Sequence, residues 1–167
     1  ESYDPVYKVN PPLRTSEDVA ALRAGLADGT IDIVATDHAP HPTEDKECEW
    51  SAAAFGMLGL ETALGVVAKT MVETGLLSWK QVAEVMSINP ARIGGYVRQG
   101  QKIAAGAPAN LTVINTTHSW SVDRQKLASK SLNTPFHGDT LPTKVVHTIY
   151  EGVFVVKDGE LTGMRHE

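Results

Sequence analysis

The chain has 167 residues, enough for one domain with a hydrophobic core or for part of a larger protein. Hydrophobic residues make up 42% and charged residues 21%, and the net charge of -5 excludes the basic surface that attracts nucleic acid. The sequence has no apolar run of the roughly 20 residues that a membrane span needs, no signal peptide and a single cysteine, so we expect a cytoplasmic protein that binds neither membranes nor nucleic acid.

The first part of the sequence alternates between strand and helix. Residues 7–9 are expected to end a strand before a stiff Asn-Pro-Pro segment. Thr15 is suited to cap a helix that ends at Asp28-Gly29. Residues 31–36 are expected to form a buried strand. This order predicts part of a parallel sheet with helices packed on it.

Two more helices are predicted downstream. Residues 52–73 are rich in Ala, Leu and Val nearly all round, so they are expected to form a long, largely buried helix ended by Gly75. Ser78 and Gln81 have the spacing of a capping box, and the helix that they begin is expected to stop at Asn89-Pro90.

From about residue 100 the sequence changes to short β-rich runs. These runs cover residues 111–114, 145–150 and 153–156, and the last two read as a hairpin. We therefore expect two parts: an α/β portion over residues 1–98 and part of a small β domain over residues 99–167. The chain does not begin with Met, which is consistent with a piece of a longer protein.

Polar residues that could bind a ligand or take part in a reaction follow the strand predicted over residues 31–36. Asp37 is suited either to capping a turn or to binding a metal ion and acting as a general base. His38 would point to the opposite face of an extended backbone, which favours a packing role. His41 lies four residues after Asp37 across a proline-containing turn, where it can meet the same ligand or serve as a surface histidine.

Two other positions are candidates for ligand binding. Asn10 can donate and accept hydrogen bonds at the end of the preceding strand, but Asn is also common in a turn before proline. Phe55-Gly56 is compatible with an ordinary helix start, or with a close approach of backbone to a ligand. Phosphate-binding, dinucleotide, serine-hydrolase and paired-cysteine motifs are all missing, so metal-assisted hydrolysis is the chemistry that remains.

Three motifs, in this order and spacing, resemble the C-terminal part of the long bacterial type of dihydroorotase, a family of the amidohydrolase superfamily. The motifs are Lys8-Val9-Asn10-Pro11-Pro12-Leu13-Arg14, Ile33-Val34-Ala35-Thr36-Asp37-His38-Ala39-Pro40-His41 and Phe55-Gly56-Met57-Leu58-Gly59-Leu60-Glu61-Thr62. The resemblance continues through residues 89–91, 106–111 and 129–136 to the final hairpin, so it covers nearly the whole chain.

The resemblance implies an α/β fold: the C-terminal part of a (β/α)8 TIM-type barrel together with part of a small β-sandwich. It implies one or two zinc ions at the barrel mouth and the reversible cyclisation of N-carbamoyl-L-aspartate to L-dihydroorotate in pyrimidine biosynthesis. Asp37 then corresponds to the family's metal-binding, proton-shuttling aspartate. Asn10 and His41 correspond to residues that bind the substrate ring and carboxylate, and Phe55 and Gly56 to the loop whose backbone touches the substrate.

The family's other metal ligands, including a His-x-His pair, and an arginine that grips the substrate lie upstream of Asn10 and are not in this sequence. A zinc site takes about three or four protein ligands. The expected partners are therefore the N-terminal half of the same enzyme, a small-molecule substrate and further copies in a homo-oligomer. The alternatives are an allantoinase- or hydantoinase-like cyclic amidohydrolase, or a non-catalytic dihydroorotase-like subunit that scaffolds aspartate transcarbamoylase.

Overall fold

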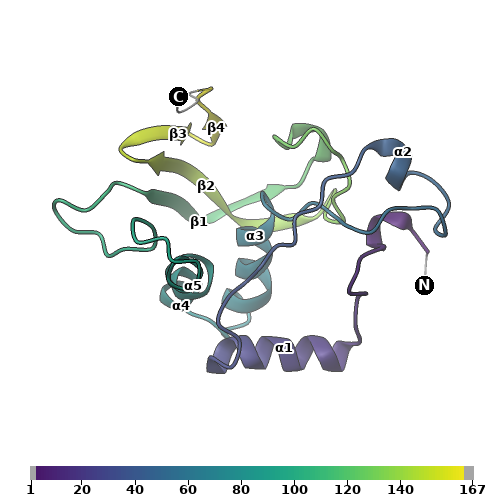
Figure 1. Ribbon diagram of the computed structural model, residues 1–167, viewed down its shortest axis with the longest axis horizontal. Coiled ribbons are helices and arrows are strands. Elements are labelled where there is room, and N and C mark those ends of the chain that lie inside the picture. The colour runs from purple at the N-terminus through teal and green to yellow at the C-terminus, as the bar shows by residue number, and fades with distance from the viewer. Residues whose placement is uncertain (1–2, 164–167) are drawn as a thin grey trace.

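The chain folds into a helical portion followed by an antiparallel sheet, as the computed structural model shows (Figure 1). The structure describes residues 3–163. The helical elements are η1 (Pro5–Tyr7), α1 (Ser16–Asp28), α2 (Thr43–Lys46), α3 (Ala63–Val67), η2 (Ala68–Val72), α4 (Trp79–Ala83), η3 (Glu84–Ile88), α5 (Asn89–Ile93) and η4 (Arg124–Lys126). The strands are β1 (Leu111–Ser121), β2 (Thr140–Tyr150), β3 (Val153–Lys157) and β4 (Glu160–Leu161).

Helix α1 begins and ends where its sequence predicts. The Thr15 side chain accepts a hydrogen bond from the Asp18 N–H and the Asp18 carboxylate accepts one from Thr15, which completes a capping box. Gly29 ends the helix in the left-handed conformation, at a φ of 87°. No residue of α1 is buried, and Leu22 is 56% exposed, because only the C-terminal end of the helix reaches the core.

The strands expected at residues 7–9 and 31–36 are wrong, since neither segment forms a strand. Residues 5–7 form the 3-10 turn η1, capped by the Asp4 carboxylate, in place of a strand end. Residues 31–36 are irregular, and the Val34 N–H donates to the Val85 carbonyl of η3. A strand is defined by a neighbour that shares its ladder, and among residues 3–163 the only parallel pairing is the isolated bridge between His38 and Met57.

The expected helix over residues 52–73 is also wrong at its N-terminal half. Residues 51–62 form turns and loop, and helical structure begins only at α3 and continues through the π-helical segment η2. The Gly56 backbone adopts a φ of 138°, which is outside the helical region. The buried face expected for this segment is real, since Val67 and Met71 lie in the main core.

The Ser78–Gln81 capping box is present and begins α4. The helical path does not stop at Asn89-Pro90: it passes through the π-helical segment η3 into α5, where Pro90 occupies the first turn. Helices α3 to η3 build the core around Val67, Met71, Leu77, Val82 and Val85.

The four-stranded sheet has the order β1-β2-β3-β4, and its neighbouring strands are all antiparallel. The hairpin predicted for the C-terminal strands is confirmed, with Tyr150 paired to Val153 across the Glu151-Gly152 turn. Helix α3 packs against β2, where a side-chain atom added at Gly65 would lie 3.0 Å from Leu141. This contact joins the helical portion to the sheet (Figure 1).

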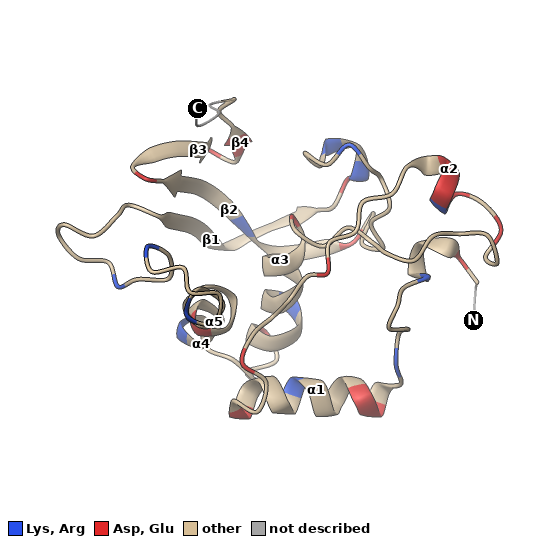
Figure 2. Ribbon diagram, viewed as in Figure 1, with Lys and Arg blue, Asp and Glu red and all other residues tan. Residues whose placement is uncertain are grey.

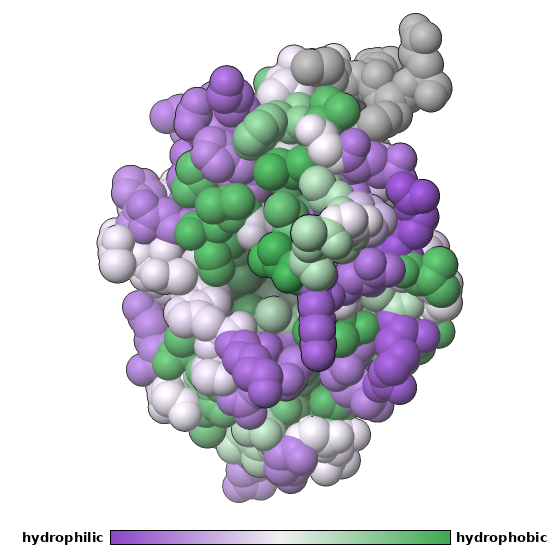
Figure 3. All heavy atoms as spheres, turned by 90° about the vertical axis from the view of Figure 1, so that its left-hand side faces the viewer, coloured by the Kyte–Doolittle hydropathy of each residue, from purple (hydrophilic) through white to green (hydrophobic). Residues whose placement is uncertain are grey.

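Charged residues are spread over both portions, and acidic side chains mark α2 and both ends of α1 (Figure 2). Hydrophobic side chains are exposed on the face shown in Figure 3, which is the side of the loop between α5 and β1. Val97 and Ile103 in that loop are 80% and 86% exposed. Within residues 3–163, no helix is both long enough and apolar enough to span a bilayer.

Candidate active site

Asp37 lies in the irregular segment that follows α1, with its side chain exposed to solvent. Its φ of 46° is left-handed, a conformation that Asp and Asn tolerate better than most residues. No hydrogen bond or ion pair engages its carboxylate within the part of the chain that the structure describes, which leaves both oxygens available to a ligand.

His41, Phe55 and Gly56 are brought together by tertiary contacts. The Nε2 atom of His41 lies 2.9 Å from the Phe55 carbonyl oxygen, so this nitrogen carries the proton and donates it. A Cβ atom placed on Gly56 would lie 3.0 Å from the same nitrogen and 2.6 Å from the Ala39 Cβ. Glycine is therefore required here for both its conformation and its size.

His38 forms hydrogen bonds with the backbone of a neighbouring loop. Its Nδ1 atom accepts hydrogen bonds from the N–H groups of Gly59 and Leu60, at 3.1 and 3.3 Å. These bonds place the proton of a neutral ring on Nε2 and fix the backbone that follows the Phe55-Gly56 segment. Gly59 also passes close to Thr36, whose carbonyl oxygen would lie 2.9 Å from an added Cβ.

Two buried lysines hold the loop between α2 and Phe55. The Lys8 ammonium donates to the carbonyls of Trp50 and Ser51 and lies 4.7 Å from the centre of the Phe55 ring. The Lys46 ammonium, only 4% exposed, donates to the carbonyls of Lys8 and Ala54. Burial, and secondarily the charge of Lys8, lower the pKa of Lys46.

The Lys8 carbonyl also accepts a hydrogen bond of 2.9 Å from the Gly56 N–H. This bond connects the motif of residues 8–14 to the motif of residues 55–62. Sequence reasoning missed the structural use of Lys8, Lys46 and Asn133, because isolated lysine and asparagine residues carry no periodicity or spacing that marks them. The one available signal was their position inside or beside the motifs.

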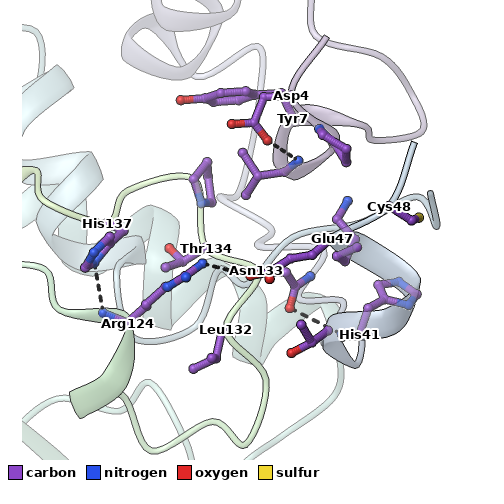
Figure 4. Close-up of a pocket in the computed structure, with 15 residues that line it drawn as sticks. Asp4, Tyr7, His41, Glu47, Cys48, Arg124, Leu132, Asn133, Thr134 and His137 are labelled. Carbon is purple, nitrogen blue, oxygen red and sulfur yellow. Dashed lines mark hydrogen bonds and ion pairs between the residues drawn. The ribbon is translucent and has the colours of Figure 1, made fainter. Parts of the chain in front are cut away.

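A cavity of about 480 Å³ lies beside this cluster, between η1, α2 and the segment of residues 132–137 (Figure 4). His41 and Asn133 line it, and their contact is visible in Figure 4 as the bond from the His41 N–H to the Asn133 side chain. Arg124 forms an ion pair of 3.3 Å with Glu47 at its wall.

Asn10 is exposed and makes no side-chain hydrogen bond within residues 3–163. It precedes a cis peptide bond to Pro11. The structure therefore brings His41, Phe55 and Gly56 into one cluster, whereas no hydrogen bond within the described residues joins Asp37 or Asn10 to it. Both side chains remain free to meet a ligand from outside.

Asp37 is suited to binding a metal, since an unpaired carboxylate is a normal ligand of divalent cations. However, residues 3–163 contain no group of three or more His, Cys, Asp or Glu side chains arranged to hold one. These residues can supply one ligand of a metal site and do not form such a site by themselves.

Comparison with solved structures defines the class of fold. L-hydantoinase (dihydropyrimidinase) from Arthrobacter aurescens superposes with a TM-score of 0.87 at 34% identity, covering 95% of this chain and 36% of that one. D-hydantoinase (dihydropyrimidinase) from Thermus sp. gives a TM-score of 0.86 at 26% identity, with 96% and 36% covered. The chain thus has an α/β fold of the TIM-barrel type, of which it spans a part.

The family follows from the sequence. Residues 9–155 match the model of the amidohydrolase family, and the chain belongs to that family. The dihydroorotase of Streptomyces coelicolor is 60% identical over 96% of this chain, and that of Mycobacterium tuberculosis is 52% identical over 96%. The chain spans 38% and 37% of these two relatives. Members of the family are generally metal-dependent.

Proposed function

We propose that this chain forms the C-terminal part of a zinc-dependent dihydroorotase, which catalyses the reversible cyclisation of N-carbamoyl-L-aspartate to L-dihydroorotate. The observation that carries the proposal is the 60% identity to the dihydroorotase of Streptomyces coelicolor over nearly the whole chain. The solved hydantoinases are more distant in sequence, at 34% identity or less for the two compared above. The exposed carboxylate of Asp37 and the His41 cluster are groups of the kind that the reaction uses.

Asp37 is the proposed proton shuttle. Hydrolysis of a cyclic amide requires removal of a proton from the attacking water and delivery of a proton to the leaving amide nitrogen. A solvent-accessible carboxylate with no hydrogen-bond partner among residues 3–163 can do both in turn. In the direction of cyclisation, the same carboxylate first takes a proton from the attacking amide nitrogen.

His41 and Asn10 are the proposed binders of the substrate. Because the Nε2 proton of His41 is committed to the Phe55 carbonyl, the neutral ring offers only an acceptor at Nδ1. His41 therefore binds a substrate carboxylate by exchanging its Nε2 hydrogen bond from the Phe55 carbonyl to that carboxylate. The exposed amide of Asn10 can both donate to and accept from the substrate ring.

The Phe55 N–H makes no hydrogen bond within residues 3–163, whereas the Gly56 N–H is bonded to Lys8. Of these two backbone donors, the Phe55 N–H is thus the one available to a substrate. We propose that the Phe55-Gly56 segment contacts the substrate through this group.

We infer that zinc binds with Asp37 as one ligand and with the remaining ligands from the N-terminal half of the same enzyme. The support is the count of ligands, since zinc takes about three or four from the protein and residues 3–163 hold no such group. When bound, zinc would supply Lewis-acid activation. We further propose that residues 1–98 belong to the barrel and residues 99–167 to a β-sandwich, and that the enzyme is a cytoplasmic homo-oligomer.

The test is a chimera in which this chain replaces its matched segment in the dihydroorotase of Streptomyces coelicolor. We expect the purified chimera to contain zinc and to open dihydroorotate faster than hydantoin or allantoin. The isolated 167-residue chain should show neither zinc above the level of a generic histidine-bearing protein nor dihydroorotase activity. A folded chimera that opens hydantoin in preference to dihydroorotate would favour the second candidate, a hydantoinase, which the structural likeness supports.

A further inference from the structure

We propose that Asn133 is a positioning residue whose side-chain amide holds the His41 and Gly56 loops at the distance that substrate binding requires. The expected effect of Asn133 on catalysis rests on the proposed function. The coupling of two loops by one amide distant in sequence rests on the hydrogen bonds alone.

Asn133 is 6% exposed, and both polar atoms of its side chain form hydrogen bonds. Its Oδ1 accepts from the His41 N–H at 3.2 Å, and its Nδ2 donates to the Ala39 carbonyl at 2.9 Å and the Gly56 carbonyl at 3.3 Å. Its own backbone carbonyl accepts from the Leu58 N–H at 3.0 Å. An asparagine amide has this complement of donors and acceptors, whereas a carboxylate lacks the donors.

The bonded groups belong to the two segments that carry the proposed substrate contacts. Ala39 and His41 precede α2, whereas Gly56 and Leu58 lie between α2 and α3. Two further bonds join these segments directly: Ala39 N–H to the Met57 carbonyl, and His41 Nε2 to the Phe55 carbonyl. Asn133 therefore bridges two loops that come within contact of each other, from a position 77 to 94 residues away in the sequence.

Loss of the amide would leave a donor and two acceptors of the backbone without their partner. Buried polar groups left unpaired are costly, so the loops are expected to shift until water or other groups satisfy them. A shift of about 1 Å in a residue that positions substrate can lower the rate on the order of 100-fold. We therefore expect a catalytic effect beyond that of an ordinary stabilising hydrogen bond.

The matched control is Asn110, which is also a bridging amide. Its Nδ2 donates to the Arg98 carbonyl at 2.9 Å and its Oδ1 accepts from the Glu151 N–H at 2.7 Å. These partners flank the sheet, and none of them belongs to the His41 cluster. Asn110→Ala removes two side-chain hydrogen bonds, whereas Asn133→Ala removes three, and it does not touch the proposed substrate contacts.

The experiment compares Asn133→Ala, Asn133→Asp and Asn110→Ala in the chimera with Streptomyces coelicolor dihydroorotase. For Asn133→Ala we expect KM for dihydroorotate to rise at least several-fold and kcat/KM to fall about 10- to 100-fold, with Asn110→Ala close to the parent. Asn133→Asp keeps the acceptor for His41 but faces two carbonyls with a carboxylate, so it should not restore activity. Equal kinetic losses in Asn133→Ala and Asn110→Ala would overturn the inference.

Amide hydrogen exchange separates this inference from the proposed function. In Asn133→Ala, the amides of His41 and Leu58 should exchange faster than in the parent, and the sheet amides should not. This measurement holds even if the chimera acts on a different cyclic amide, which would contradict the dihydroorotase assignment only. Unchanged exchange across both loops would refute the role of Asn133 whatever the substrate.

Discussion

Substitution of Gly56 by alanine tests whether close packing at this residue governs the candidate site. Gly56 has a φ of 138°, and the added methyl would lie 2.6 Å from the Ala39 Cβ and 3.0 Å from the His41 Nε2. Carbon atoms in contact normally lie about 3.5 to 4.0 Å apart. The backbone of one loop must therefore move by about 1 Å, because the Ala39 Cβ has no torsion of its own that could carry it away.

The loss of stability in Gly56→Ala has two contributions, one from backbone conformation and one from overpacking. A non-glycine residue in a sparsely populated backbone conformation costs about 1 to 3 kcal/mol, and overpacking of a tight site costs about 1 to 3 kcal/mol. We therefore expect Gly56→Ala to destabilise by about 2 to 6 kcal/mol. The displaced loop carries the contact between His41 and Phe55, so kcat/KM should fall on the order of 100-fold.

Gly75→Ala is the matched control. Gly75 also has a positive φ, 75°, but nothing lies within 4 Å of its added Cβ, so only the conformational cost of about 1 to 2 kcal/mol applies. Both variants are made in the chimera, and urea unfolding and dihydroorotase kinetics are measured on each. If Gly56→Ala were no less stable than Gly75→Ala and retained the parent kcat/KM, close packing at Gly56 would not govern the site.

Three further predictions concern individual side chains. In the chimera, Asp37→Asn should keep the fold, as judged by circular dichroism, and lower kcat about 10²- to 10⁴-fold, because the amide is not a base; retention of more than half the turnover would contradict the proposed role. His41→Ala and Asn10→Ala should weaken substrate binding by roughly 1.5 to 3 kcal/mol at unchanged zinc content, whereas loss of zinc with unchanged KM would place them in the metal site. Lys46→Met tests the buried ammonium, whose pKa in the folded state lies below the ordinary value of 10.5. Between these two pKa values the unfolded chain binds more protons than the folded chain. The free energy of unfolding of the wild type should therefore rise with pH in that window, relative to the variant. Urea unfolding from neutral pH to 10.5 measures this difference, and a flat difference would show that burial does not lower the pKa.

Elements controlled by neighbouring residues could be predicted from the sequence. The N-cap at Thr15, the capping box at Ser78, the end of α1 at Gly29 and the hairpin at Glu151-Gly152 all depend on groups within a few residues of one another. Local hydrogen bonds and turn conformations are available to any chain with that spacing. The family was likewise readable from three motifs, because identical residues at the right separation need no structure to be compared.

The sequence names candidate residues of the site but not the contacts between them. His41, Phe55 and Gly56 were named from their motifs, yet the bond between His41 and Phe55 and the exclusion of a methyl at Gly56 depend on the fold. Asn133 could not be found from spacing, since its bonds span 77 to 94 residues. The use of buried Lys46 is similarly non-local, because its acceptors lie on two different segments.

Tertiary structure also decided where regular structure does not form. Residues 31–36 have the composition of a strand, but a strand needs a ladder partner, and the described residues offer a single bridge at His38. The apolar stretch before α3 has helical composition, but its backbone is bonded to Lys8, His38 and Asn133 in place of its own helical turns. Composition determines which residues avoid water, whereas partners distant in sequence determine which backbone groups they pair with.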